Sequence, residues 1–307
     1  MNIALALTGA KDTSMWHAAL QQHLPQARVL DWAVGAPSCD YAVAWAPPPQ
    51  FFAEQTRLKA LFSAGAGVDH IVKAPNLPTE LPVVRIEDAG MAQQMAHYCL
   101  WAVGRAAYGF DSYAQAQRER RWIEGFAAEH VGASVGVLGL GVLGGHVART
   151  LAQTGYEVHG YSQSCKQIEG VQCWHGDALE NFLAATQILI VIAPRTPQTT
   201  GMINAALLQK LKRPAHLINI ARGALVNDAD VLAALDAGIL SGATLDVFAK
   251  EPLPQDHPYW THSKVTVTPH VSGKTVIGPA MAQIADKIKR LELGEPVTGL
   301  VDRSKGY

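Results

Sequence analysis

Three side chains in the second half of the chain could together carry out acid–base chemistry on a small acid: Arg222, Glu251 and His270. An arginine can bind a carboxylate and polarise a neighbouring carbonyl, and a histidine can exchange a proton with the hydroxyl group that results. A glutamate beside that histidine can stabilise its charged form. Each of the three follows or closes a short apolar run typical of a buried strand. We therefore expect them to meet at one edge of a parallel sheet and to support hydride transfer.

A glycine-rich loop lies upstream of these residues, where positions 139–144 read Gly-Leu-Gly-Val-Leu-Gly. An apolar strand precedes the loop and a helix-like segment follows it, which is the context of a dinucleotide-binding turn. Gly139 permits the tight turn, Gly141 lets a pyrophosphate approach the backbone, and Gly144 lets helix and strand pack closely. The predicted site includes the two residues between the last glycines, Val142 and Leu143.

The residue after the next strand discriminates between cofactors. An NAD-binding domain normally carries an acid there to bind both ribose hydroxyls, whereas this chain has Ser162, followed by Gln163, Ser164 and Lys166. An acid repels a ribose phosphate, but hydroxyls, an amide and an ammonium can bind it, so NADPH is favoured and NADH is the alternative. Further cofactor contacts are expected at Ala193, Pro194, Thr200, Ile220, Ala221, Asp246 and Ser272.

The elements that must position these residues alternate between apolar runs and helix-like segments, which predicts an α/β protein with two doubly wound parallel sheets. The expected strands of a small first domain are residues 3–7, 28–30, 41–45, 60–63 and 83–85. One long helical stretch is expected over 90–121 and a final helix over 278–291. Six further strands make a complete dinucleotide-binding sheet: 135–139, 157–161, 188–192, 216–220, 243–247 and 265–268.

Because the last helix can return to the first domain, that domain is predicted to be discontinuous. We expect a flavodoxin-like substrate domain formed by residues 1–99 and 276–307, with a Rossmann domain, residues 100–275, inserted in it. A chain of 307 residues suits two domains of ordinary size.

Composition excludes several classes of partner. The formal net charge of -1 argues against binding to nucleic acid or to an anionic membrane. Four widely spaced cysteines, with no histidine pair placed like metal ligands, predict free thiols and no metal site. The apolar start lacks a basic leader, and no apolar run is long enough to span a bilayer. We expect a soluble, cytoplasmic protein.

Several motifs resemble those of the D-isomer-specific 2-hydroxyacid dehydrogenase family, and the resemblance covers nearly the entire chain. They are Asn-Ile-Ala-Arg-Gly at 219–223, Leu-Asp-Val-Phe at 245–248, Glu-Pro-Leu-Pro at 251–254 and Thr-Pro-His at 268–270. Segments 41–48, 65–70, 88–91, 294–299 and 301–307 are similar to the glyoxylate/hydroxypyruvate reductase A branch of that family.

The resemblance implies reduction of a small 2-keto acid with NADPH, in a homodimer built through the helical stretch 90–121. Arg222 would bind the substrate carboxylate and carbonyl oxygen, and the backbone N–H groups of Ala66 and Gly67 would bind the other carboxylate oxygen, with the keto acid held between the domains. His270 would donate the proton while Glu251 stabilises its charged form. Asp246 would contact the nicotinamide, and Trp45 would border the substrate pocket and keep it small.

Other interpretations stay open at this point. The same three residues would serve a reductase of a bulkier 2-keto acid, such as a phenyl or branched-chain pyruvate, if there is aliphatic room near Trp45. A protein that senses the nucleotide without catalysis is another class, against which Arg222, Glu251 and His270 argue. Trp45 itself could simply pack in the core. Gln93 and the pair Ser272-Gly273 depart from the family pattern, and these departures bear on the substrate preference and the fine cofactor contacts.

Overall fold

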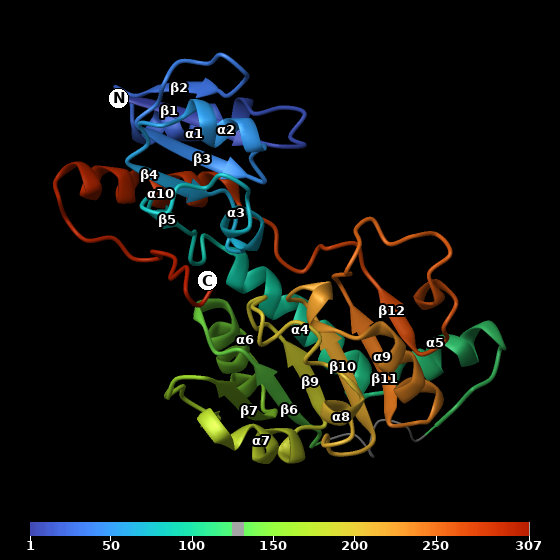
Figure 1. Ribbon diagram of the computed structural model, residues 1–307. Coiled ribbons are helices and arrows are strands. Elements are labelled where there is room, and N and C mark those ends of the chain that lie inside the picture. The colour runs from blue at the N-terminus through green and yellow to red at the C-terminus, as the bar shows by residue number, and fades with distance from the viewer. Residues whose placement is uncertain (125–131, 307) are drawn as a thin grey trace. The chain divides into compact units, whose positions relative to one another are not determined.

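The computed structural model describes residues 1–124 and 132–306, which form two compact units. The first unit comprises Met1–Met91 and Thr275–Tyr307, and the second comprises Ala92–Lys274. Each unit is built on one parallel sheet with helices packed against it (Figure 1). Two doubly wound sheets confirm the predicted fold class. The division of labour between a substrate domain and a cofactor domain stays a prediction.

The sheet of the first unit has the strand order β2-β1-β3-β4-β5, which is the flavodoxin-like order. Strands β3 and β4 are buried on both faces, at Tyr-Ala-Val-Ala of β3 and Ala-Leu-Phe-Ser of β4, which explains why nearly all of these residues are apolar. The strands are β1 (Asn2–Leu7), β2 (Arg28–Asp31), β3 (Tyr41–Trp45), β4 (Ala60–Ser63) and β5 (Val83–Val84).

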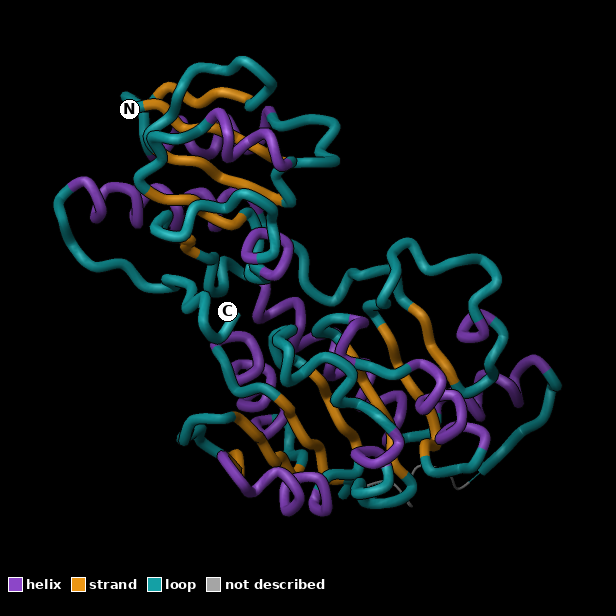
Figure 2. The backbone as a smooth tube through the Cα atoms, viewed as in Figure 1, coloured by secondary structure: helices purple, strands orange, loops and turns teal. Residues whose placement is uncertain are grey.

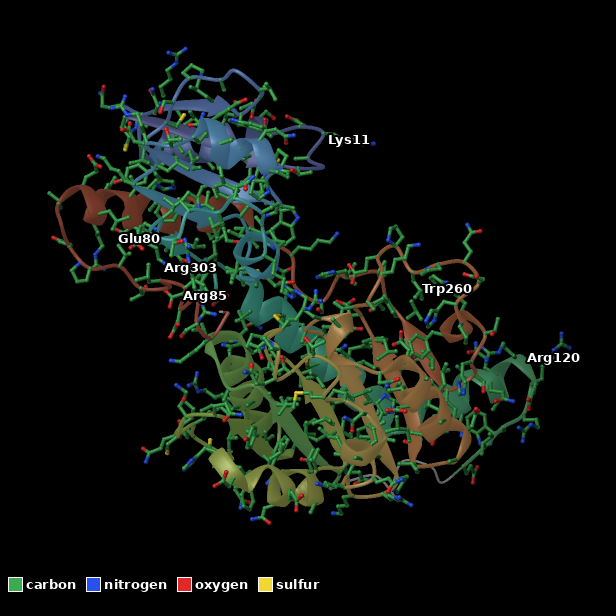
Figure 3. All side chains as sticks on the ribbon, viewed as in Figure 1. Lys11, Glu80, Arg85, Arg120, Trp260 and Arg303 are labelled. Carbon is green, nitrogen blue, oxygen red and sulfur yellow. The ribbon has the colours of Figure 1, made fainter. Side chains whose placement is uncertain are left out.

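Helices cover both faces of this sheet. Helices α2 (Pro49–Glu54) and α3 (Asp69–Val72) contribute buried side chains to one apolar cluster with the strands. Helix α1 (Ser14–His23) packs against α10 (Ile277–Glu292), and the C-terminal helix belongs to the first unit. The segment after α10 is fixed as well, since the guanidinium of Arg303, labelled in Figure 3, donates to the carbonyl oxygen of Pro78 at 2.7 Å.

The sheet of the second unit has seven strands in the order β12-β11-β10-β9-β6-β7-β8. From β8 to β11 this is the strand order of a Rossmann domain, with β12 added at the far edge. Figure 2 draws strands in orange and helices in purple. The strands are β6 (Ser134–Leu138), β7 (Glu157–Ser162), β8 (Val171–His175), β9 (Ile188–Val191), β10 (Ala215–Asn219), β11 (Leu240–Leu245) and β12 (Val265–Val267). The central strands β6 and β9 are buried at every position.

The helices of this unit pack on both faces of the sheet. Helices α7 (Leu179–Ala185), α8 (Ala205–Leu208) and α9 (Asp228–Asp236) contribute to the apolar cluster on one face. Helices α4 (Met91–Ala107) and α6 (Val142–Gln153) contribute to the cluster on the other. Helix α5 (Phe110–Arg118) and the short 3-10 helices η2 (Gly176–Ala178), η3 (Gly223–Leu225) and η4 (Pro258–Trp260) complete the described elements.

Two details of the predicted elements are wrong. The second sheet has seven strands and not six, because β8 was missed: it lies at the sheet edge, and its Val-Gln-Cys-Trp-His sequence has no position that is fully buried. The helical stretch 90–121 is two helices, since Gly109 adopts the left-handed region at φ 61° and interrupts the backbone pattern between α4 and α5.

Three chemical features of the described residues bear on the predicted classes. All four cysteines are free thiols. In residues 1–124 and 132–306, no cluster of three or more histidine, cysteine, aspartate or glutamate side chains could hold a metal ion. No helix in that part of the chain combines the length and the apolar character needed to cross a membrane.

Candidate active site

The three predicted catalytic residues follow neighbouring strands of the second sheet. Asn219 of β10 pairs with Leu245 of β11, and Leu245 pairs with Val267 of β12. The carboxyl ends of these parallel strands therefore lie at the same edge of the sheet, where ligands of such sheets bind. Arg222 follows β10 and His270 follows β12, while Glu251 lies in the connection that leaves β11.

His270 and Glu251 form the central pair of this edge. The imidazole Nδ1 of His270 lies 2.8 Å from the carboxylate Oε2 of Glu251. The second carboxylate oxygen accepts a hydrogen bond from the backbone N–H of Phe248 at 2.9 Å, which fixes the orientation of the carboxylate. The side chains are 43% and 36% exposed, so the imidazole can be reached by a small molecule. A histidine oriented in this way can act as an acid or a base through its other ring nitrogen.

The connection between Glu251 and β12 is anchored at several points. The indole of Trp260, labelled in Figure 3, donates to the carbonyl oxygen of Pro254 at 2.8 Å. The hydroxyl of the buried Tyr259 donates to Asp228 at 2.9 Å, and this bond ties the connection to the start of α9. The connection that begins at Glu251 is therefore held by one bond within itself and by one bond to α9.

Asp246 organises the loop that carries His270. Its side chain is completely buried, and its Oδ1 accepts hydrogen bonds from the Thr268 hydroxyl at 2.6 Å and the Val271 N–H at 2.9 Å. Its Oδ2 accepts a bond from the Ser272 N–H at 2.8 Å, and its backbone oxygen accepts one from the His270 N–H, also at 2.8 Å. The loop is thus wrapped around one carboxylate. The predicted contacts of Asp246 and Ser272 with the cofactor stay predictions.

Arg222 is held by a polar turn at the end of β10. The buried amide of Asn219 accepts a hydrogen bond from the Ala221 N–H at 3.1 Å and donates one to the Arg222 carbonyl oxygen at 3.2 Å. One guanidinium nitrogen of Arg222 donates to the Ala221 carbonyl oxygen at 2.7 Å. Gly223 follows in close contact with the backbone of Phe248, where a β-carbon would lie 1.9 Å from the Phe248 carbonyl carbon. The arginine loop and the segment that leads to Glu251 therefore touch through their backbones.

The glycine loop between β6 and α6 has the geometry that a dinucleotide needs. Gly139 has φ +111°, and a β-carbon on Gly144 would lie 1.9 Å from the Gly139 carbonyl oxygen, so the strand and the helix approach closely only with glycine there. A β-carbon on Gly141 would meet no heavy atom within 4 Å. Open space at the N-terminal end of a helix is where a pyrophosphate binds. Val142 and Leu143 form the first turn of α6.

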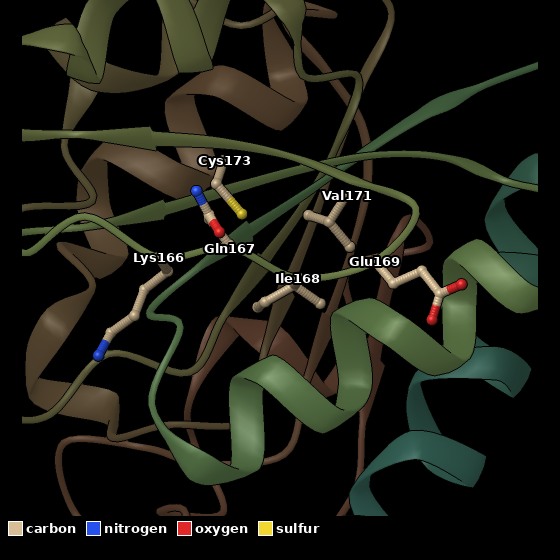
Figure 4. A pocket seen from close by; sticks show the side chains of 6 residues that line it. All are labelled: Lys166, Gln167, Ile168, Glu169, Val171 and Cys173. Atoms are coloured by element: carbon tan, nitrogen blue, oxygen red, sulfur yellow. The ribbon is translucent and has the colours of Figure 1, made fainter.

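The predicted ribose-phosphate contacts lie in the loop that leaves β7. The Ser162 hydroxyl donates to the Ser164 carbonyl oxygen at 2.7 Å, and Gln163, Ser164 and Lys166 are exposed. Beside them is a shallow hollow of about 460 Å³, shown in Figure 4. Its lining residues are Lys166, Gln167, Ile168, Glu169, Val171 and Cys173.

The other predicted cofactor residues lie after neighbouring strands at the same edge. Ala193 is buried against the glycine loop, with its backbone nitrogen 2.8 Å from where a β-carbon on Gly139 would be. The Pro194 carbonyl oxygen accepts a bond from the Thr199 hydroxyl at 2.7 Å, and the Thr200 hydroxyl donates to the Thr196 carbonyl oxygen at 2.7 Å. After β10, Ile220 and Ala221 are both buried.

The predicted substrate residues of the first unit lie at the ends of its strands. Ala66 and Gly67 follow β4, and the buried Ser63 hydroxyl donates to the Gly67 carbonyl oxygen at 3.1 Å. Among residues 1–124 and 132–306, no hydrogen bond is made by the backbone N–H of Ala66 or of Gly67. Trp45 ends β3, is 39% exposed and lies with its ring centroid 4.0 Å from that of His70. It is therefore not a core residue.

An apolar hollow of about 250 Å³ lies beside Trp45 in the first unit. Its lining residues are Leu7, Thr8, Ala10, Trp16, Trp45, Ala64 and Thr275. The Thr275 hydroxyl donates to the Ala64 carbonyl oxygen at 3.0 Å and closes one side of this hollow. No pattern in the sequence indicates this space, because its walls come from five separate segments of the chain.

Two residues absent from the predicted site support it, Thr268 by direct contact and Tyr98 through Thr268. Thr268 bonds to Asp246, and the Tyr98 hydroxyl in α4 lies 2.6 Å from the Thr268 hydroxyl. Thr268 belongs to the Thr-Pro-His motif that ends in His270, and this position in the sequence could have identified it as a site residue. Tyr98 had none, because its partner lies 170 residues away along the chain.

Comparison with known proteins gives consistent matches. A family model described as D-isomer specific 2-hydroxyacid dehydrogenase, NAD binding domain, matches residues 100–272. The chain is 43% identical over 303 residues to glyoxylate/hydroxypyruvate reductase A of Photorhabdus laumondii, a match that covers 96% of this chain and 97% of the relative.

Two solved structures are similar over 99% or more of the chain. One is a D-isomer specific 2-hydroxyacid dehydrogenase from Xanthobacter autotrophicus in complex with NADPH and MES, with a TM-score of 0.94, 42% identity and 99% coverage of both chains. The other is an NADPH-dependent glyoxylate/hydroxypyruvate reductase from Sinorhizobium meliloti in complex with NADP and sulfate, with a TM-score of 0.92, 34% identity, and coverage of 100% of this chain and 99% of that one.

Proposed function

The chain belongs to the family of D-isomer specific 2-hydroxyacid dehydrogenases, and from this premise we propose that it reduces small 2-keto acids with NADPH. The substrates are glyoxylate, which gives glycolate, and hydroxypyruvate, which gives D-glycerate. The names of the Photorhabdus and Sinorhizobium relatives support this substrate class. The observation that carries the proposal is the His270–Glu251 pair at 2.8 Å, at the sheet edge where Arg222 also lies.

In the proposed reaction, His270 donates a proton from Nε2 to the carbonyl oxygen, since its Nδ1 is already bonded to Glu251. The carboxylate of Glu251 stabilises the positive imidazole before that transfer. The guanidinium of Arg222 binds the carboxylate of the acid and polarises its carbonyl. Because His270 is 43% exposed, it can recover its proton from solvent after each turnover.

The residues after β6 and β7 fit a dinucleotide with a ribose phosphate. The open space at Gly141 admits the pyrophosphate beside the start of α6. Ser162, Ser164 and Lys166 offer hydroxyls and an ammonium group, with no carboxylate among residues 162–166 to repel a phosphate. When bound there, NADPH supplies the hydride that the carbonyl carbon accepts. NADH is the weaker cofactor in this proposal.

The first unit supplies the remaining substrate contacts in this proposal. The N–H groups of Ala66 and Gly67 are available to bind a carboxylate oxygen, since they donate to no other atom within the described part of the chain. Trp45 limits the size of the acid's side chain.

The test is an absorbance assay with purified protein, glyoxylate or hydroxypyruvate, and NADPH or NADH in parallel. We expect faster oxidation of NADPH and a loss of about a hundredfold or more in kcat for His270→Ala, since a general acid contributes about 10²- to 10⁴-fold. His262→Ala is the matched control, because it removes a histidine that pairs with Asp236 at 3.4 Å and precedes β12, at the opposite end of that strand from His270. No oxidation with either acid, or equal loss in both variants, would contradict the proposal.

A bulkier 2-keto acid is the second candidate, and the apolar hollow beside Trp45 favours it. A space of about 250 Å³ lined by Leu7 and Trp16 can hold a phenyl or branched aliphatic group. The same assay with phenylpyruvate and a branched-chain keto acid separates the candidates. A kcat/KM for either that exceeds the value for glyoxylate and hydroxypyruvate would replace the small-acid assignment. A protein that binds NADPH and reduces none of these acids would instead be a nucleotide sensor.

We also propose that the chain forms a homodimer through α4, α5 and the segment that follows them. Trp101, Phe110 and Trp122 of this region are exposed, and Trp122 is 90% exposed. Light scattering after size exclusion should give twice the chain mass of 32.9 kDa, and Trp122→Ala should weaken the association. A monomer at micromolar concentration would contradict it.

The four free thiols fit a reducing compartment, and we propose the cytoplasm as the place of action. Fractionation of expressing cells should recover the protein with cytoplasmic markers.

A further inference from the structure

The hydrogen bonds behind the His270 loop continue into α4. Asp246 is completely buried, and Thr268 donates its hydroxyl proton to Oδ1 of Asp246 at 2.6 Å. A hydroxyl has a single proton, so the 2.6 Å contact between the Tyr98 and Thr268 hydroxyls is a bond in which Tyr98 donates. The three groups form one directed chain of hydrogen bonds from the phenol through the threonine to the carboxylate.

The phenol is suited to remain a donor. Burial raises the pKa of Tyr98, and the nearby Asp246 carboxylate raises it too, while the bond to Thr268 acts in the opposite direction. The phenol therefore keeps its proton throughout the neutral range. Its ring is packed edge-on against Trp101 in α4, with centroids 5.3 Å apart, which fixes its direction.

His270 needs such support because its backbone is in an unfavourable conformation. Its φ is +53°, in the left-handed region that only a few per cent of residues other than glycine adopt. Such conformations persist where the surroundings hold them and are common at functional sites. Here the surroundings are the Asp246 backbone oxygen, which accepts the His270 N–H at 2.8 Å, and the Asp246 carboxylate, which holds the residues on either side.

We infer that Tyr98 and Thr268 are positioning residues for the reaction, and that they act by holding Asp246 and with it the loop that places the His270 imidazole. This inference rests on the proposed function, because it assigns the two residues to the same proton transfer. Neither residue touches the acid or the cofactor in it. Removal of either hydroxyl should lower kcat at saturating NADPH through misplacement of the imidazole.

The test compares four variants. Tyr98→Phe removes only the phenol hydroxyl and should lower kcat about three- to tenfold, the worth of one neutral hydrogen bond. Thr268→Val removes a donor to a buried carboxylate and should lower kcat about ten- to a hundredfold, whereas Thr268→Ser keeps the hydroxyl and should restore most of the activity. Tyr41→Phe is the matched control, since the buried Tyr41 donates its hydroxyl to Glu292 at 2.7 Å in the first unit.

Thermal unfolding and NADPH titration by fluorescence accompany the kinetics, so that a loss of stability is distinguished from a loss of positioning. A purely structural role predicts that Tyr98→Phe and Tyr41→Phe lower the melting temperature alike and keep wild-type kcat in the folded protein, which would overturn the inference. A Thr268→Ser variant as slow as Thr268→Val would overturn it as well, because the retained hydroxyl would then have no effect on the rate.

A second readout keeps the inference separate from the proposed function. In protein with ¹⁵N-labelled histidine, the ring resonances of His270 should shift or broaden in Tyr98→Phe and stay unchanged in Tyr41→Phe. If the wild-type protein reduces no keto acid, the proposed function fails while this spectrum still decides the positioning role. Unchanged His270 resonances in Tyr98→Phe would refute it.

Discussion

A close approach of two backbone segments at Gly223 makes a single methyl group a sharp test of the site's geometry. Gly223, which follows Arg222, is buried against the segment that leads to Glu251. In Gly223→Ala, the new β-carbon would lie 1.9 Å from the Phe248 carbonyl carbon, 2.2 Å from the Ala249 nitrogen and 2.3 Å from the Phe248 α-carbon. All three atoms belong to the backbone, so no side chain can rotate away to make room.

The size of the effect follows from these distances. Ordinary contacts of a β-carbon begin at 3.4 Å, so the two loops must separate by about 1 Å or more, and overpacking of this kind costs about 1 to 3 kcal/mol of unfolding free energy. A displacement of about 1 Å at a reacting centre lowers a rate about a hundredfold. Because Arg222 lies on one loop and Glu251 on the other, we expect kcat/KM for glyoxylate to fall by about that factor.

The assay is steady-state NADPH oxidation at a temperature where urea unfolding shows the variant to be folded. Gly278→Ala is the matched control, because Gly278 is exposed in α10, its φ is not positive and its β-carbon would meet no heavy atom within 4 Å. That control should keep wild-type activity, with stability unchanged or raised by up to about 1 kcal/mol. A folded Gly223→Ala protein with wild-type kcat/KM would refute the idea that the two loops are coupled through their backbones.

Three further predictions concern the charged and polar groups. Glu251→Gln should lower kcat about tenfold, since a charged partner of His270 at 2.8 Å becomes neutral; an unchanged kcat would show that the carboxylate only orients the ring. Ser162→Asp should raise KM for NADPH by about tenfold or more, the worth of one charged hydrogen bond, and improve the use of NADH. The measurement is the ratio of kcat/KM for NADPH to kcat/KM for NADH. An unchanged ratio would show that Ser162 does not contact the ribose phosphate. Burial raises the pKa of Glu87, but the Thr298 hydroxyl and the Lys287 ammonium together lower it by more, so the net shift is downward. The ionised Glu87 therefore stabilises the fold fully above the ordinary glutamate pKa, and this stabilisation is lost as the pH falls through the lowered pKa. The unfolding free energies of Glu87→Gln and wild type, measured in urea, should differ at neutral pH and converge in acid. A difference that is independent of pH would contradict this.

Most strands could be predicted because parallel strands buried on both faces leave continuous apolar runs in the sequence. Strand β9, Ile-Leu-Ile-Val, is buried at all four positions and is unmistakable. Strand β8 pairs only with β7 at the sheet edge and mixes polar and apolar residues, so it left no such run. The break at Gly109 was equally hidden, because a single glycine in a helical pattern does not reveal its φ.

The residue types of the site could be predicted, but the contacts that hold them could not. Arg222, Glu251 and His270 stand at strand ends, and strand ends meet at one edge by the geometry of a parallel sheet. The positive φ of His270 and the bond between Tyr98 and Thr268 depend on atoms brought together from distant segments. No spacing rule in the sequence reports such contacts.

Two loops of the site are held by buried polar side chains that end or follow β10 and β11. Asn219 bonds to both sides of the Arg222 turn, and Asp246 bonds to both sides of His270. A buried amide or carboxylate left without partners destabilises the fold. Movement of either loop would leave such a group without partners, so it would lower the stability of the unit. The hydrogen bonds that satisfy Asn219 and Asp246 therefore also fix the loops that carry Arg222 and His270. This explains how reactive side chains on short loops can be held precisely, and it predicts that Asn219→Ala and Asp246→Ala impair catalysis although neither side chain is expected to touch the proton that is transferred.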